Sequence, residues 1–243
     1  MTYCVGLLLE AGIVMLSDTR TSAGMDNIGC FRKMFVFDRP GERAIVMMTS
    51  GNLSVTQTVM AKLQHDADRS DATPESSILL AETMLDVAEI VGRTLFEVGM
   101  SVRARMKQID NSASASASII LGGQRKGGRL RLFHIYREGN FIAATDDTPY
   151  LQIGEFKYGK PILDRVVNPG SSLEDGRKCV LLSMDSTMRS NISVGMPLDL
   201  VVIERDAYAI GHRARYEAGD PKFSAMSEAW SRVLRDGFTN MPD

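Results

Sequence analysis

The chain opens with short apolar runs separated by turn residues. The first two runs cover residues 3–9 and 13–17, with a Glu-Ala-Gly segment between them. Two more cover residues 34–37 and 44–49, separated by a segment that contains proline and glycine. Apolar runs this short, bounded by such residues, are typical of strands joined by tight turns. The sequence therefore predicts antiparallel sheet at the start of the chain.

Helical spacing follows the first strands. The pattern predicts a helix from Leu53 to about His65 and a second, beyond Pro74, from Ser76 to about Met106. In the second segment, apolar residues recur mostly at intervals of three and four: Leu79, Met84, Leu85, Ala88, Val91, Leu95, Val98 and Val102. One continuous apolar stripe of this kind predicts a helix that packs against a core.

The middle of the chain returns to strands. After a Ser/Ala-rich segment over residues 111–118, apolar residues 119–121 and 130–136 flank a basic, glycine-rich turn. This arrangement predicts a hairpin, and the alternation over residues 130–136 predicts that one face of its second strand is buried. Residues 141–144 form a further short apolar run.

Two helices and a final strand pair complete the predicted elements. They cover residues 160–166, 172–189, 198–204 and 207–212, and a tail of about residues 214–243 follows. Strands and helices are grouped rather than strictly alternating, which favours an α+β layered fold over repeated βαβ units. A chain of 243 residues can bury one sizeable core, so we expect a single domain over residues 1–243.

The charge pattern and the lengths of the apolar runs argue against several classes of function. The formal net charge is −2 and the basic residues are scattered, which argues against nucleic acid or an anionic membrane as a partner. The densest basic group, within residues 125–131, is split by two glycines and indicates a solvated turn. No apolar run is long enough to span a bilayer, and the start lacks the pattern of a signal peptide, so we expect a cytoplasmic protein.

Cysteine and histidine patterns give no sign of a metal or a cofactor. Cys4, Cys30 and Cys179 form no CxxC pair and no even disulfide set, which suits a reducing compartment and predicts small buried side chains. The three histidines are far apart and outside any HExxH motif, and GxSxG and GxxxxGK motifs are absent. We therefore expect neither a bound metal nor a cofactor.

The residue behind the initiator methionine suggests a nucleophile. If Met1 is removed, Thr2 carries a hydroxyl and a free α-amine on one residue. An α-amine has a pKa of about 7.7–8.0, so it can accept the hydroxyl proton directly or through a water. A threonine here also lets an aminopeptidase remove the methionine.

Several landmarks in order carry a family resemblance. They are Thr2, Ser17-Asp18-Thr19-Arg20, Phe31-Arg32-Lys33-Met34, Thr49-Ser50-Gly51-Asn52 and Leu182-Ser183-Met184-Asp185-Ser186. With them, over roughly residues 2–213, the chain resembles the proteasome β subunit and HslV family of N-terminal nucleophile hydrolases, most closely its bacterial Anbu branch. This resemblance implies a four-layer αββα sandwich of two antiparallel sheets between helical layers.

The resemblance also implies a catalytic role for five residues. Thr2 would be the nucleophile, and Lys33 would favour loss of its proton and lower the pKa of the amine. Asp18 would hold Lys33 charged, Gly51 would donate its backbone N–H to the oxyanion, and Asp185 would help to hold the amine or the nearby loop. Family pocket positions correspond to Thr21, Met47 and Thr49, and the secondary candidates are Arg20, Glu155, Ser186 and Ser190.

Two departures from the family pattern bear on activity. Glu155 stands where the family has a serine that bonds the terminal amine, and a carboxylate there would raise the pKa of the amine. Met188 replaces a second serine, which leaves Ser186, Thr187 or Ser190 as substitutes. The positioning of the amine is therefore open.

The sequence thus predicts a threonine-type endopeptidase that forms a homo-oligomer, either a closed ring or an open spiral. Its substrate would be a peptide or protein, and an unidentified ATPase would be a partner only by analogy with HslV. Two alternatives stay open: an assembly protein with little or no hydrolytic activity, and a small-molecule amidohydrolase with the same nucleophile.

Overall fold

The strands that open the chain lie in two different sheets of the computed structural model, which describes residues 1–22, 28–108 and 115–242. The first sheet has the order β10-β1-β2-β11-β12 and only antiparallel neighbours. Its strands are β1 (Tyr3–Leu9), β2 (Gly12–Asp18), β10 (Tyr150–Gly154), β11 (Leu198–Glu204) and β12 (His212–Tyr216).

The second sheet is also antiparallel and has the order β5-β6-β7-β8-β9. Its strands are β5 (Met34–Arg39), β6 (Arg43–Gly51), β7 (Ala117–Arg125), β8 (Arg131–Ile135) and β9 (Phe141–Ala143). A two-stranded ribbon of β3 (Arg20–Ser22) and β4 (Ile28–Cys30) lies between β2 and β5 in the chain. The predicted α+β class with antiparallel sheets is confirmed.

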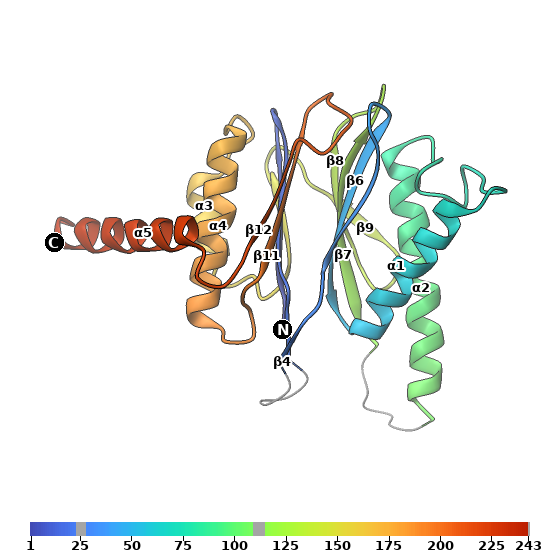
Figure 1. The fold of residues 1–243 in the computed structure, drawn as a ribbon, viewed down its shortest axis with the longest axis horizontal. Coiled ribbons are helices and arrows are strands. Elements are labelled where there is room, and N and C mark those ends of the chain that lie inside the picture. The colour runs from blue at the N-terminus through green and yellow to red at the C-terminus, as the bar shows by residue number, and fades with distance from the viewer. Residues whose placement is uncertain (23–27, 109–114, 243) are drawn as a thin grey trace.

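Helices lie on the outer side of each sheet in Figure 1. They are α1 (Leu53–Asp68), α2 (Met84–Met106), α3 (Lys160–Val166), α4 (Leu173–Ser190) and α5 (Pro221–Thr239). Figure 1 shows α1 and α2 beside the second sheet, α3 and α4 beside the first, and the two sheets facing each other. No helix in the described ranges is both long and apolar enough to cross a bilayer.

The sheets are buried on both faces. One hydrophobic cluster lies between α1, α2 and the second sheet, another between the two sheets, and a third between the first sheet and the α3 and α4 side. The prediction of one buried face for residues 130–136 is therefore wrong. Leu132 packs between the sheets, while Phe133 and Ile135 pack toward the helices, because the strand lies between two layers.

The second helix begins later than the apolar spacing predicts. Thr83 and Asp86 form a capping box that starts α2 at Met84, eight residues after the predicted start at Ser76. Residues 77–81 instead form turns, whose carbonyl groups at residues 78 and 81 accept hydrogen bonds from the Arg43 guanidinium. Leu85, predicted to be part of the core stripe, is exposed.

The second strand of the final pair begins later than the predicted start at residue 207. Asp206 and Tyr208 have positive φ angles of 63° and 52°, so this segment turns, and β12 begins only at His212. The tail after residue 214 contains α5, which the pattern did not predict. Cys30 is also exposed, contrary to the expectation that every cysteine is buried.

Candidate active site

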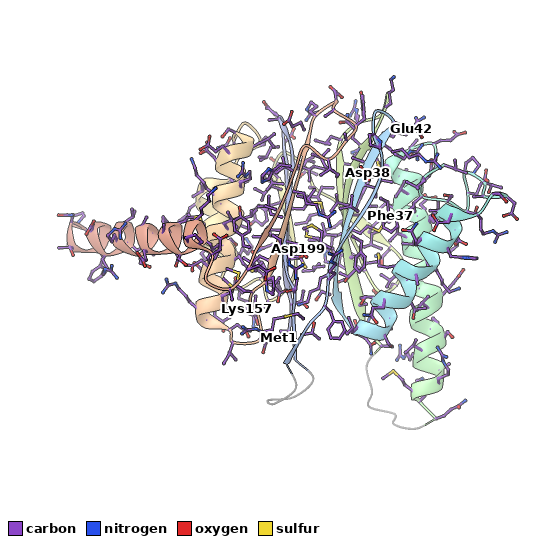
Figure 2. The ribbon with its side chains drawn as sticks, in the orientation of Figure 1. Met1, Phe37, Asp38, Glu42, Lys157 and Asp199 are labelled. Carbon is purple, nitrogen blue, oxygen red and sulfur yellow. The ribbon has the colours of Figure 1, made fainter. Side chains whose placement is uncertain are left out.

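Four of the five residues with predicted catalytic roles gather where several strands end. Thr2 precedes β1, Asp18 ends β2, Lys33 precedes β5, and Gly51 ends β6. Figure 2 shows Met1 at this end of the sheets and Glu42, in the β5–β6 turn, at the other end. The fold therefore brings four separate sequence segments to one edge of the sandwich.

A cavity of about 310 Å³ opens at this edge. Its described lining consists of Met1, Thr2, Thr21, Lys33, Thr49, Ser50, Gly51, Leu53, Thr56 and Gly154. Thr2, Lys33 and Gly51 thus share one cavity with two of the three predicted pocket residues, Thr21 and Thr49. The third, Met47, is fully buried in the core against α1 and α2 and is not part of the described lining.

A buried ion pair lies at the site, formed by Lys33, which lines the cavity, and Asp18. The Lys33 Nζ atom lies 2.8 Å from Asp18 Oδ1, and both residues are at most 3% exposed. Lys33 also donates to the carbonyl oxygens of Arg20, at 2.5 Å, and Met1, at 3.5 Å. Asp18 accepts further hydrogen bonds from the backbone N–H groups of Tyr3, at 3.1 Å, and Gly195, at 3.4 Å. A buried charge pair needs such additional hydrogen bonds to offset its desolvation.

Burial and the neighbouring charges shift two pKa values here. Burial raises the pKa of Asp18, and Lys33 and the two backbone N–H donors oppose that change. The pKa of the α-amine at Met1 is lowered, first by burial and then by repulsion from Lys33, while Asp18 acts in the opposite direction. An amine at this position therefore loses its proton more readily than one in water.

Two glycines fix the backbone around Thr2. Gly154 has a φ of +85°, and a side chain there would collide with the Thr2 carbonyl, which accepts a 2.7 Å hydrogen bond from the next backbone N–H, that of Glu155. Gly51 has a φ of +107°, and a side chain there would collide with the Ser116 carbonyl. Only glycine adopts such φ values without strain, so both close approaches require it.

The strand alternation orients the backbone of Gly51. The Thr49 N–H donates to the Lys33 carbonyl at 2.9 Å, on the edge of β6 that faces β5. Backbone groups two residues apart on a strand point to the same side. The N–H of Gly51 therefore points to the same side of β6 as that of Thr49, the side of β5. It lies past the end of the β5–β6 ladder, because β5 begins at Met34, opposite Met48.

Asp185 and Glu155 have partners away from Thr2. The Asp185 carboxylate accepts hydrogen bonds from Arg189 Nε at 3.0 Å and from Ser227 Oγ at 2.8 Å, and so links α4 to α5. The Glu155 carboxylate accepts a 3.2 Å hydrogen bond from Asn191 Nδ2. Glu155 is also absent from the charges that shift the pKa of the terminal amine.

The other predicted polar candidates lie outside the described lining of the cavity. The Arg20 guanidinium donates to the Ile192 carbonyl at 2.9 Å. Thr187 uses its hydroxyl within α4, where it donates to the Ser183 carbonyl, and Met188 packs against the core. Ser186 is half-buried and Ser190 is exposed at the end of α4.

Sequence reasoning missed a polar cluster behind Thr2. Tyr3 is fully buried, and its hydroxyl lies 2.6 Å from Ser183 Oγ and accepts a 2.6 Å hydrogen bond from Gln152 Nε2. Ser183 donates in turn to the Gly159 carbonyl, and burial raises the pKa of Tyr3. The cluster ties the residue after Thr2 to β10 and α4. Its members are far apart in sequence, so no local motif could have revealed it.

Within the described ranges, no group of three or more His, Cys, Asp or Glu side chains is arranged to hold a metal ion.

Comparison with known proteins gives close structural matches. No family model and no curated protein matches the chain. Anbu (ancestral beta-subunit) from Yersinia bercovieri is 40% identical, with a TM-score of 0.90 over 99% of this chain and 98% of that one. An Anbu (Gly-1) mutant from Hyphomicrobium sp. strain MC1 is 44% identical, with a TM-score of 0.91 over 100% and 99% of the two chains. A structure described as the helical assembly of the Anbu complex from Pseudomonas aeruginosa is 43% identical, with a TM-score of 0.91 over 99% and 97%.

Proposed function

The chain belongs to the Anbu family of proteasome-like proteins, and from that premise we propose that it is an N-terminal threonine peptidase that works as a homo-oligomer. The observation that carries this proposal is the buried Lys33–Asp18 pair, whose lysine lines the same cavity as Thr2 and Gly51. A lysine held charged at 2.8 Å from a carboxylate, next to a threonine that becomes terminal, suits nucleophile activation.

Removal of Met1 would create the active residue. The α-amine would then belong to Thr2, on the same residue as the hydroxyl. The lowered pKa of the present terminal amine supports its use as a base, because burial and Lys33 both favour its neutral form. The Lys33 charge would also stabilise the alkoxide that forms as the hydroxyl loses its proton.

The reaction would proceed through a threonyl ester. Thr2 Oγ attacks the substrate carbonyl carbon, and its proton passes to the α-amine. The Gly51 N–H, which faces the cavity edge of β6, stabilises the resulting oxyanion. The C–N bond then breaks, and the amine gives its proton to the leaving nitrogen. Water, deprotonated by the amine, hydrolyses the ester and restores the Thr2 hydroxyl.

The proposal extends to fold, assembly and location. The sheets and helices form a four-layer αββα sandwich in a single domain, and copies assemble into a closed ring or an open spiral in the cytoplasm. Thr21 and Thr49 line the pocket for the substrate residue next to the scissile bond, and the substrate is a peptide or protein. An unidentified ATPase is a partner only by analogy with HslV.

A second candidate is an assembly protein with little hydrolytic activity. Two observations favour it: Glu155 is bonded to Asn191, and Asp185 is bonded to Arg189 and Ser227. Neither carboxylate is thus committed to holding the terminal amine of Thr2. A small-molecule amidohydrolase is the third candidate, since a 310 Å³ cavity suits a compact acyl group as well as a peptide residue.

Intact mass spectrometry with a threonine-directed peptide epoxyketone or β-lactone tests these candidates. Loss of Met1 and one adduct, absent in Thr2→Ala, supports a competent nucleophile. Cleavage of a peptide library then supports the peptidase, whereas turnover of small amides alone supports the amidohydrolase. Complete loss of Met1 with no adduct from either reagent supports the assembly protein.

A further inference from the structure

Thr2 depends on the residue behind it for its position. In the part of the chain that the structure describes, the backbone of Thr2 has a single hydrogen bond, which its carbonyl accepts from the Glu155 N–H at 2.7 Å. Pairing of β1 with β10 starts at Tyr3, and pairing with β2 starts one residue later, at Cys4. Thr2 therefore lies just outside the strand, where a chain end is poorly ordered unless other contacts tie it down.

The backbone N–H of Tyr3 connects Thr2 to the buried ion pair. It donates to Asp18 Oδ1 at 3.1 Å, and the same oxygen atom lies 2.8 Å from Lys33 Nζ. This N–H belongs to the peptide bond between Thr2 and Tyr3, and a peptide bond is planar. The orientation of that plane therefore sets where the Cα atom of Thr2 lies relative to Lys33.

The side chain of Tyr3 is held at its far end by a hydroxyl network. The Tyr3 hydroxyl accepts a 2.6 Å hydrogen bond from Gln152 Nε2 and lies 2.6 Å from Ser183 Oγ. Ser183 has one hydroxyl proton and donates it to the Gly159 carbonyl at 3.0 Å, so Tyr3 is the donor in its bond to Ser183. Tyr3 is also fully buried. A buried network in which each member has a partner is rigid, and it gives the Tyr3 ring one position.

We propose that Tyr3 is a positioning residue for the reaction at Thr2: its hydroxyl network keeps the Thr2–Tyr3 peptide bond in the orientation that places the terminal threonine beside Lys33. This inference rests on the proposed function, because it concerns the same nucleophile. Tyr3 lies outside the described lining of the cavity and acts through the main chain. Glu155 and Asp185, the carboxylates considered for holding the amine, have hydrogen-bond partners elsewhere.

Adduct kinetics on the full chain test this role. Tyr3→Phe removes only the hydroxyl and keeps the ring, and a peptide epoxyketone is the probe. Intact mass spectrometry follows the species that has lost Met1, so the rate refers to a terminal threonine in every variant. We expect the maximal rate of adduct formation to fall by about 10- to 100-fold, because a displacement of about 1 Å at a reacting group costs up to about 100-fold. The epoxyketone concentration at half-maximal rate should stay the same, because the cavity lining is unchanged.

The pH profile of the maximal rate separates positioning from a loss of stability. Burial and repulsion from Lys33 lower the pKa of the terminal amine, and Asp18 opposes them. Tyr3→Phe lets the amine of Thr2 move away from these surroundings into water, so the midpoint of the profile should rise toward the ordinary range of about 7.7–8.0. A variant that is only less stable keeps the wild-type midpoint as long as it stays folded.

Two control variants lose a hydroxyl away from the Tyr3 network. Tyr150→Phe makes the same exchange on β10, where the hydroxyl bonds to Asp164 and Lys160 outside the described cavity lining. Thr83→Ala removes the capping box of α2 and so lowers stability without a change near Thr2. We expect both controls to keep the wild-type rate and midpoint.

Gln152→Met provides a second, milder variant. It removes one of the two hydrogen bonds at the Tyr3 hydroxyl. Residue 152 is half-buried on β10, an edge strand of the first sheet, so the fold should tolerate the change. We expect a smaller loss of rate and a smaller rise of the midpoint than in Tyr3→Phe. Circular dichroism and the urea midpoint verify that each variant is folded under the assay conditions.

The outcomes distinguish this inference from the proposed function. Tyr3→Phe and Gln152→Met with the wild-type rate and midpoint would refute the positioning role and leave Thr2 as the nucleophile. A loss of rate in Tyr3→Phe that Thr83→Ala matches, at an unchanged midpoint, would assign the loss to stability and would also refute the positioning role. Wild-type protein that loses Met1 but forms no adduct would overturn the proposed function, and this inference with it.

Discussion

Replacement of Asp18 by asparagine perturbs the candidate site at its most buried point. Asp18 accepts three described hydrogen bonds at Oδ1 and Oδ2, and Lys33 forms its buried ion pair with this carboxylate. In Asp18→Asn, one amide oxygen can still serve Lys33 and Tyr3, but the amide NH₂ group then faces the Gly195 N–H. The Lys33 ammonium also becomes a buried charge without a counter-charge.

The expected losses of stability and of adduct rate are large because the Lys33–Asp18 ion pair is buried. Removing one partner of a buried ion pair costs about 3–5 kcal/mol, and the retained amide hydrogen bond argues for the lower end. At about 2–4 °C per kcal/mol for a chain of this size, the Tm should fall by roughly 6–12 °C. Because Asp18 would no longer hold the Lys33 side chain in place beside the cavity, the rate of adduct formation at Thr2 should fall at least about 100-fold, as for a lost electrostatic stabiliser.

Calorimetry and the adduct rate by intact mass measure the two effects. Asp199→Asn is the matched control, because its pair with Arg215 is partly exposed and such pairs contribute about 0–1 kcal/mol. Stability and adduct rate for Asp18→Asn that both match the Asp199→Asn control would refute the role assigned to the buried pair. A loss of rate with unchanged stability would show that the ion pair does not stabilise the fold, but it would keep Asp18 in the site.

Three further predictions concern the backbone, pH and α5. Gly51→Ala should lower the free energy of unfolding by roughly 1–3 kcal/mol, because alanine is strained at φ +107°; equal urea midpoints for variant and wild type would contradict this. Burial lowers the pKa of His134, so the unfolded chain binds the proton more readily; stability is full above about pH 6.5 and falls below it, and His134→Phe should flatten that dependence in urea titrations. Ser227→Ala should lower the free energy of unfolding by about 1–3 kcal/mol, because Asp185 and Arg189 each lose a hydrogen bond; Ser224→Ala, at an exposed position on the same helix, should change it by less than about 0.5 kcal/mol.

Local periodicity was enough to locate most elements. The bounds of β1, α3 and β11 agree with the predicted ranges, because each is a run whose apolar spacing ends at a turn or a proline. The pattern missed β10 and misplaced β12, since a strand at a sheet edge needs partners from distant parts of the chain. It also started α2 too early, because apolar turns over residues 77–81 continue the helical spacing without forming helix.

The candidate site was likewise only partly predictable from the sequence. The order of landmarks in the sequence was enough to select Thr2, Asp18, Lys33 and Gly51, and the fold brings them to one edge. The landmarks could not show that Met47 is core while Thr49 reaches the cavity, because both lie on the same strand face and differ only in their distance from its end.

The sequence by itself determined the class of the fold, most of the strands and helices, and the residue types available for chemistry, because these depend on neighbours within a few positions. Only the tertiary structure decided which polar groups meet. Asp185 pairs with α5, Glu155 with Asn191, and Tyr3 with Ser183, across separations of 36 to 180 residues. Contacts over such distances depend on how the layers pack, and no local pattern encodes that packing.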